Sequence, residues 1–181
     1  MFRSLLFGLF VASLAQCSVI KRDAPGIVAS LNAISSQLAT MNSTLNTFPG
    51  GAGNTLVALQ VQGEAQTLLD TINNGTKVAN QTGPLDVNDS ALVVDAVLTL
   101  QPNIYGVLNH IIAAKPDFDT AVLGLASAAI LVKSDLTNLK NSTDQLFSAT
   151  VSKLVTDIQN LAPLVQALVD LYFVEAINTY S

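Results

Sequence analysis

Side chains suited to acid–base or metal chemistry are few in this sequence and stand apart from one another. It contains one histidine, His110, and one cysteine, Cys17. His110 has no histidine, cysteine or glutamate partner at the spacing that would place two ligands on one helical face. Asp117 and Asp119 stand at the start of an apolar segment, where two carboxylates favour helix capping over an acid pair.

The sequence also lacks the local motifs of common hydrolases and nucleotide-binding proteins. It has no GxSxG, HExxH, P-loop or GxGxxG pattern. The glycine-rich residues 50–53 (GGAG) follow no strand pattern, so they indicate a turn between helices. We therefore expect a protein that is not an enzyme and that has neither a metal site nor a cofactor.

The N-terminus has the features of a secretory signal. Arg3 precedes an apolar segment, Leu5 to Ala15, and small residues allow cleavage after Ala15 or Cys17. We assign residues 1–17 to a signal peptide. Cys17 would be lost with it or with the segment that follows, and the mature chain would then have no disulfide.

A short pro-segment, residues 18–22, ends in the basic pair Lys21 and Arg22, which resembles a furin-type or kexin-type processing site. Cleavage there would leave residues 23–181, whose 159 residues carry five lysines and thirteen acids, a charge of −8. Such acidity argues against nucleic acid or an anionic membrane as a partner. The alternative is that the pair is only a charged linker.

Candidate sites of N-glycosylation support secretion. Five Asn-X-Ser/Thr triplets are present, three of them between residues 74 and 90, which predicts an exposed connection there. The C-terminal residues lack the hydrophobic tail of a lipid-anchor signal. The candidate asparagines are Asn42, Asn74, Asn80, Asn88 and Asn141.

The composition is apolar, with 50% hydrophobic residues, 12% charged residues and a mean hydropathy of +0.47. After the N-terminus, the longest continuous apolar run, Ala121 to Val132, contains Gly124 and Ser127. It is shorter than the roughly 20 residues that a membrane-spanning helix needs. We expect no transmembrane segment in the mature chain.

Apolar residues recur at alternating steps of four and three, which is the period of amphipathic helices. The pattern predicts an all-α, single-domain bundle of about five helices over residues 23–181. The first three are expected at about 25–47, 54–79 and from a cap at Asp89 or Ser90 to Lys115. The last two are expected as long arms within 117–172, with Asp117 as the cap of the first and the polar stretch 140–144 as the break between them.

Glycines and prolines are expected to weaken or bend three of these helices. Gly75 predicts that the second helix frays after Asn74, because glycine costs about 1 kcal/mol relative to alanine inside a helix. Pro102 and Pro163 fall inside the third and last helices and predict kinks.

Several fixed stretches occur in this pattern, and they resemble one known family. The stretches are Phe48-Pro49-Gly50-Gly51, Lys115-Pro116-Asp117-Phe118, residues 132–139 (VKSDLTNL), residues 140–146 (KNSTDQL) and residues 176–180 (AINTY). Together they are similar to the fungal hydrophobic surface binding protein A family, also called cell wall galactomannoproteins. The resemblance covers about residues 24–181, nearly the whole predicted mature chain.

This resemblance implies a secreted, non-catalytic mannoprotein of the fungal cell wall. Members are associated with hydrophobic surfaces, with recruitment of a secreted hydrolase to them, with cell-wall polysaccharide, and with a long-chain fatty acid held inside the bundle. The alternative is a structural, antigenic wall glycoprotein with a filled core and no ligand. The small residues around Gly124 and Ala129 fit both, because they allow close helix packing or leave room for an acyl chain.

If a cavity exists, the helical stripes line it. Its candidate lining residues are Leu38, Leu68, Ile72, Val97, Ile104, Leu108, Leu125, Ala129, Leu136, Ile158, Val165 and Tyr172. No lysine or arginine lies on a stripe, so a ligand carboxylate would need a neutral partner. The candidates for that role are Ser35, Gln60, Gln62, Tyr105, Ser127 and Tyr172.

Overall fold

The structure, a computed structural model, describes residues 23–48, 55–121 and 127–181, and all regular structure in them is helical. Five helices are long: α1 (Ala24–Asn46), α2 (Thr55–Gln81), α3 (Val87–Ala113), α5 (Ser127–Val151) and α7 (Ala162–Thr179). Two are short: α4 (Lys115–Ala121) and α6 (Thr156–Gln159). The predicted all-α fold is confirmed. The predicted signal peptide, the pro-segment and the turn at 50–53 lie outside the described residues.

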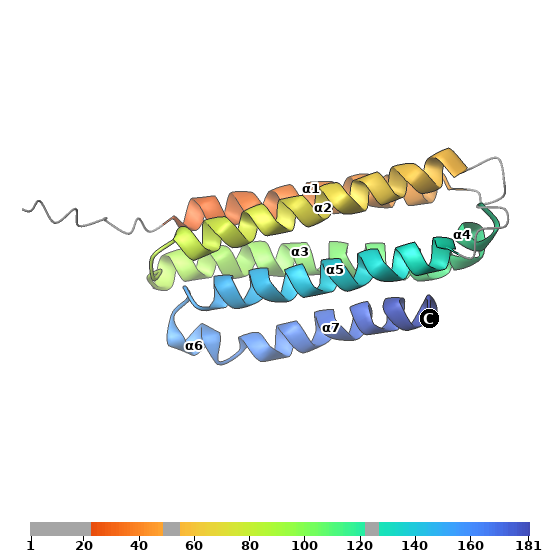
Figure 1. Cartoon of the computed structure of the whole chain (residues 1–181). Helices are drawn as coiled ribbons and strands as arrows, with labels where there is room; N and C mark the ends of the chain where they lie inside the picture. The colour runs from red at the N-terminus through yellow and green to blue at the C-terminus, as the bar shows by residue number, and fades with distance from the viewer. Residues whose placement is uncertain (1–22, 49–54, 122–126) are drawn as a thin grey trace, which may run out of the picture.

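The five long helices form an elongated bundle that closes on itself (Figure 1). α1 packs against α2 and α3, α2 packs against α5, and α7 packs against both α3 and α5. The helices therefore follow one another around a ring in the order α1, α2, α5, α7, α3. α6 lies at one end of this ring and α4 at the other (Figure 1).

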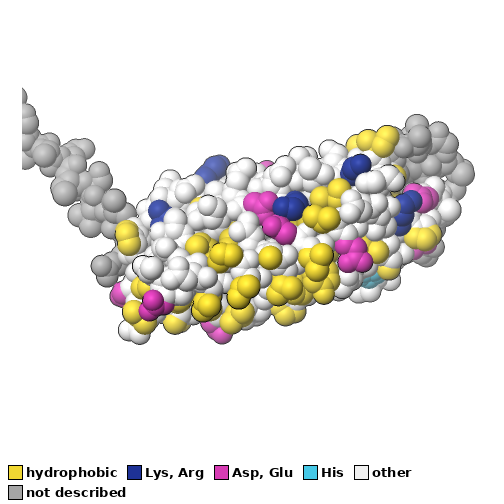
Figure 2. Space-filling model, turned by 90° about the horizontal axis from the view of Figure 1, so that it is seen from below, with side chains coloured by type: hydrophobic (Ala, Val, Ile, Leu, Met, Phe, Trp, Pro, Cys, Tyr) yellow, Lys and Arg dark blue, Asp and Glu magenta, His cyan; other side chains and the backbone are white. Residues whose placement is uncertain are grey.

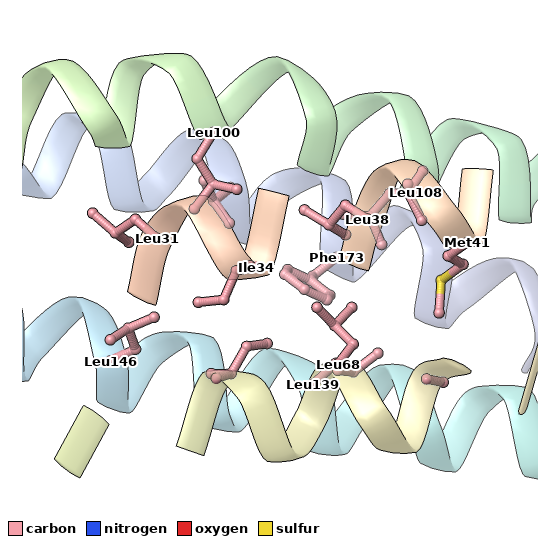
Figure 3. Packing of buried hydrophobic residues seen from close by; sticks show 14 of the residues in the cluster. Leu31, Ile34, Leu38, Met41, Leu68, Leu100, Leu108, Leu139, Leu146 and Phe173 are labelled. Atoms are coloured by element: carbon pink, nitrogen blue, oxygen red, sulfur yellow. The ribbon is translucent and has the colours of Figure 1, made fainter. Parts of the chain in front are cut away.

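The predicted four-three stripes supply the core. Leu31, Ile34 and Leu38 of α1 are at most 5% exposed. Figure 3 shows these side chains pointing into the bundle, where leucines from α2, α3 and α5 and Phe173 of α7 meet them. Burial of such side chains is worth about 1.5–3 kcal/mol each and is the main force that holds the helices together.

α2 does not fray after Asn74 but continues to Gln81, so that prediction is wrong. Gly75 is buried, and a Cβ at this position would lie 3.4 Å from Leu146 Cδ1 and 3.4 Å from Ser30 Cβ. The missing side chain lets α2 approach α1 and α5 closely. The packing gained there outweighs the low helix propensity of glycine.

α3 begins earlier than the sequence predicts. Its N-cap is Asp86, whose Oδ1 accepts a hydrogen bond from the backbone N–H of Asp89 at 3.0 Å. The predicted caps, Asp89 and Ser90, are therefore wrong. Ser90 is fully buried, and its Oγ accepts a hydrogen bond from the N–H of Val155 at 3.1 Å, which ties α3 to the turn before α6. Pro102 lies inside α3, and the helix continues past it to Ala113.

The predicted division of residues 117–172 into two arms is wrong. Asp117 lies in the first turn of α4 and is not a cap, and residues 140–144 lie within α5. Lys140 Nζ pairs with Asp144 Oδ2 at 2.9 Å, one helical turn away, so charged groups of this polar stretch support the helix. The inward-facing side of the helix also continues through residues 140–144, because Thr143 lies on that side between Leu139 and Leu146.

The chain reverses instead between Val151 and Ala162, around α6. Pro163 stands in the first turn of α7, where its missing N–H removes no helical hydrogen bond. It therefore begins a helix, and the predicted kink is wrong. Because α7 starts anew, Val169 and Phe173 face inward, while Leu161 and Leu168 are 63% and 51% exposed.

Two segments, Val87–Ala113 and Thr156–Thr179, are long and apolar enough to cross a membrane by length and composition alone. Only 28% and 17% of their most apolar windows are buried in the bundle. A core helix of a water-soluble protein passes the same test, and both segments pack into the helical ring. The absence of a transmembrane segment therefore stays a prediction.

Candidate binding cavity

Three cavities follow one another along the axis of the bundle. The largest, of about 300 Å³, lies at the α6 end between α3, α5 and α7, and one of about 210 Å³ lies at the α4 end between α2 and α5. A smaller one of about 50 Å³ lies between them. The small cavity shares Leu100 and Ile104 with the α6-end cavity, and Leu136 and Leu139 with the α4-end cavity. The three cavities therefore form a row of adjoining spaces. The two end cavities are partly open to the surface, where the exposed Leu98 and Leu161 line one and the exposed Leu59 and Leu131 line the other.

The walls of this row are almost entirely apolar. Small-molecule pockets commonly measure about 300–1,000 Å³ and carry a few well-placed polar groups among apolar side chains. The α6-end cavity reaches that range. Its polar lining residues are Gln101, Thr143, Asp144, Thr150 and Gln166.

Thr150 is unusual among these polar groups. It is 4% exposed, and its hydroxyl is buried with no hydrogen-bond partner. Other threonines, such as Thr76 in α2 and Thr82 just after its end, donate to the carbonyl four residues earlier, at 3.1 and 2.8 Å. Leaving a buried hydroxyl unpaired costs about 1–3 kcal/mol, so the unpaired Thr150 hydroxyl lowers the stability of the folded protein.

The α4-end cavity carries a carboxylate. Asp135 lines it, and its Oδ1 accepts a hydrogen bond from Gln66 Nε2 at 2.9 Å. Burial raises the pKa of Asp135, and the bond from Gln66 opposes that shift. No lysine or arginine is among the residues that line this cavity. A second anion would be repelled here.

Most of the predicted lining residues face the row of cavities. Val97, Ile158 and Val165 line the α6-end cavity, and Ile104 lines both it and the central one. The central cavity is also lined by Leu38, Leu68, Ile72, Leu108 and Leu136.

Three of the predicted lining residues are placed otherwise. Ala129 packs against the core, and Tyr172 stacks on Tyr105 with 4.1 Å between ring centroids. Neither is among the residues that line a cavity. Leu125 lies outside the described residues.

Among the polar side chains predicted for a ligand carboxylate, Gln62 lines a cavity, at the α4 end. Gln60 donates to Thr44 and Glu64, Ser35 accepts from Asn103, and neither Gln60 nor Ser35 lines one of the three cavities. Tyr105 accepts from Gln101. Of Ser127, the backbone alone is described.

Sequence reasoning missed Thr143 and Thr150, because it counted apolar residues alone. With Leu136, Leu139 and Leu146, these threonines complete a four-three series on the inner face of α5. That spacing was the available signal.

The single histidine takes part in no acid–base array. His110 Nδ1 lies 3.0 Å from Asn42 Oδ1, a link between α3 and α1. Among the residues that the structure describes, no group of three or more histidines, cysteines or carboxylates could hold a metal ion.

The sequon asparagines differ in exposure. Asn74, Asn80, Asn88 and Asn141 are exposed, whereas Asn42 is half-buried. The predicted exposed connection at 74–90 is wrong in part. Its asparagines lie on α2 and α3, and between these helices Thr82 and Leu85 are buried.

A row of exposed leucines runs along the outer face of α7. Leu161, Leu164, Leu168 and Leu171 are each 51% exposed or more, and Val174 at the end of the row is 44% exposed. Their steps of three and four place them on one helical face. Figure 2 shows apolar side chains along most of the face seen from below, where α7 lies, with acidic groups beside them. We call these five residues the α7 leucine row.

The sequence model of the family named hydrophobic surface binding protein A matches residues 24–152. A comparison with curated protein sequences found no match.

The fold matches solved structures of ligand-binding proteins. The crystal structure of AFMP4P in complex with palmitic acid is 31% identical in sequence, with a TM-score of 0.80, and the match covers 88% of this chain and 100% of that one. Ligand binding domain 1 of the Penicillium marneffei MP1 protein, complexed with arachidonic acids, is 17% identical, with a TM-score of 0.78 and coverage of 88% and 99%. Ligand binding domain 2 of the same protein, complexed with multiple arachidonic acids, is 16% identical, with a TM-score of 0.78 and coverage of 89% and 97%.

Proposed function

Because the chain belongs to the hydrophobic surface binding protein A family, we propose that it is a non-catalytic protein that holds a long-chain fatty acid in the row of cavities. The observation that carries this proposal is the row itself: adjoining apolar spaces of about 300, 50 and 210 Å³ between the helices of one ring, the two larger ones partly open to the surface. A structure of similar fold, 31% identical in sequence, contains palmitic acid.

The shape of the interior favours a chain over a compact ligand. The central cavity is narrow and lies between leucines and isoleucines of four helices, so a ring system would need the helices to separate. An acyl chain needs a slender path, and side-chain rotation at Ile104 would join the central cavity to the α6-end cavity, as rotation at Leu139 would join it to the α4-end cavity. Each methylene buried contributes about 0.8 kcal/mol, so affinity should increase with chain length until the row is full.

Native mass spectrometry of the secreted, deglycosylated protein tests this proposal. We expect a co-purifying fatty acid, or uptake of one added palmitic acid per chain. Leu108→Trp is a variant meant to block binding. Leu108 lines the central cavity and is 3% exposed, so the larger side chain should fill that cavity and reduce the uptake of palmitic acid. An apo mass that persists after palmitic acid is added to the folded wild type would contradict the proposal and leave the structural wall protein as the alternative.

The α7 leucine row favours a second activity, adsorption to uncharged apolar surfaces. Monomeric proteins rarely expose a large continuous apolar patch without a binding role. Acidic groups lie on the same face as the row (Figure 2), and the ammonium group of Lys140 on that side is already paired with Asp144 and Asp170, which disfavours an anionic membrane as the surface.

Adsorption to alkyl-coated beads tests this activity. Replacing Leu164, Leu168 and Leu171 together by glutamine should reduce adsorption and leave palmitic acid uptake intact. Leu56→Gln is the control, because Leu56 is 79% exposed on α2. Equal adsorption of all three proteins would rule out the row as the adsorbing surface.

We further propose that the protein is secreted to the cell wall, with removal of residues 1–17 and cleavage after Arg22. Asp23 supports this boundary, since its Oδ1 caps α1 by accepting from the Gly26 N–H at 3.0 Å. Glycans are proposed at the five sequons, and a secreted hydrolase or wall polysaccharide as a partner. Intact mass before and after glycosidase treatment would give the mature N-terminus and the number of glycans.

A further inference from the structure

We propose that Thr150 receives the polar head of the bound lipid, so that a fatty acid enters with its carboxyl group at the α6 end and its chain directed toward α4. This inference rests on the proposed function and adds an orientation and a head-group site to it.

The first support is the unpaired hydroxyl. Thr150 is 4% exposed, lines the α6-end cavity, and its Oγ1 has no hydrogen-bond partner. A buried hydroxyl without a partner is unfavourable unless something else supplies one. A carboxyl group in the adjoining cavity would accept a hydrogen bond from it.

The second support is the distribution of polar groups along the interior. Gln166 lines the same cavity as Thr150 and carries an amide donor. Gln101 lines it too, and its Nε2 uses one N–H for Tyr105 at 2.6 Å and retains the second. Thr143 lines both this cavity and the central one. The α6 end therefore offers neutral donors to a head group, and the central cavity offers apolar walls to the chain.

The third support is charge. At the α4 end, the cavity is lined by the carboxylate of Asp135 and by no cation. At the α6 end, the lining carboxylate of Asp144 is paired with Lys140 at 2.9 Å, and the same ammonium group reaches Asp170 at 2.7 Å. The carboxylate that lines the cavity therefore has a cation partner at the α6 end and none at the α4 end, which disfavours the reversed orientation.

Thr150→Val separates a ligand contact from a structural role, because valine has the shape of threonine without the hydroxyl. Without bound ligand, Thr150→Val should unfold at the same temperature as the ligand-free wild type or at a higher one, since it lacks the unpaired buried hydroxyl. Its affinity for palmitic acid should fall roughly tenfold or more, as expected for loss of a hydrogen bond to a charged or strongly polar group. Thr150→Ser keeps the hydroxyl and should restore most of the affinity.

Methyl palmitate is the matched ligand, because it keeps the chain and removes the charged head. Its affinity should change much less than that of palmitic acid in Thr150→Val. Thr82→Val is the matched protein control: Thr82 is 2% exposed, but its hydroxyl donates to the Val78 carbonyl at 2.8 Å and it lines none of the three cavities. This control should lose stability and keep its affinity for palmitic acid.

The outcomes are distinct. If Thr150→Val binds palmitic acid as tightly as the wild type, an ordered water satisfies the hydroxyl and the inference is wrong. If Thr150→Val loses affinity for palmitic acid and for methyl palmitate equally, Thr150 only shapes the cavity and the inference is also wrong. If the folded wild type binds neither ligand, the proposed function itself fails, and the head-group site fails with it.

Discussion

Lys140 of α5 and Asp170 of α7 form an ion pair, with 2.7 Å between Nζ and Oδ1. The same ammonium group lies 2.9 Å from Asp144 Oδ2, so one cation joins two helices that close the ring over the α6-end cavity. Hydrogen bonds to Asp170 and then to Asp144 raise the pKa of Lys140. The contribution of this ion pair to stability is therefore fully present at neutral pH and is lost only as the pH rises through the raised pKa.

Lys140→Met should lower the free energy of unfolding by about 1 kcal/mol, since it leaves two carboxylates without their cation on partly exposed side chains. The loss should shrink in high salt, which screens the pair. Urea denaturation at low and high ionic strength measures both effects. Lys115→Met is the control, because Lys115 pairs with Asp119 inside one helix at 2.6 Å. Equal losses in the two variants would show that the link between α5 and α7 contributes nothing.

Tyr180→Phe should weaken the α4 end of the bundle. The buried hydroxyl of Tyr180 donates to the carbonyl of Ile111 at 2.8 Å, which fixes the end of α7 to α3. Burial, together with Asp119 and Asp117, raises the pKa of Tyr180. Loss of the bond should cost about 1 kcal/mol and lower the midpoint of thermal unfolding by about 2–4 °C. Tyr172→Phe keeps the stack on Tyr105 and should change the midpoint little.

Asp135→Asn should alter the pH dependence of stability. Because burial raises the folded-state pKa of Asp135, its favourable contribution is greatest below its ordinary pKa and is lost as the pH rises through the folded value. Asparagine can still accept from Gln66, so the variant should match the wild type in acid and equal or exceed it at neutral pH. Urea denaturation at both pH values measures this. A variant that is less stable only at neutral pH would contradict the assigned direction.

Two glycines of α2 should respond differently to alanine. A Cβ at Gly63 meets nothing within 4 Å, so Gly63→Ala should raise the free energy of unfolding by about 1 kcal/mol through helix propensity. At Gly75 the same Cβ meets Leu146 and Ser30 at 3.4 Å, so Gly75→Ala should gain less or lose stability. Thermal unfolding of the pair tests whether close packing at Gly75 explains the full length of α2. Equal gains would show that it does not.

Local sequence determined the helices as such. A four-three apolar period and capping side chains act within a few turns, so α1 and its buried residues Ile27 to Leu45 could be predicted from the sequence. The apolar composition also predicted an all-α bundle, and the spacing of Leu38, Leu68 and Ile104 correctly placed these residues on inward faces.

The breaks and faces in the C-terminal part depended on tertiary contacts. Residues 140–144 have turn chemistry in isolation, but Lys140 pairs with Asp144 and Asp170, so the helix continues. α7 is apolar on two sides, and periodicity alone cannot say which side faces inward. The ring selects Val169 and Phe173 and leaves Leu164 and Leu171 outside. The exposure of the α7 leucine row, the row of cavities and the unpaired Thr150 hydroxyl were decided only when α7 packed between α3 and α5, because they depend on contacts between segments far apart in the chain.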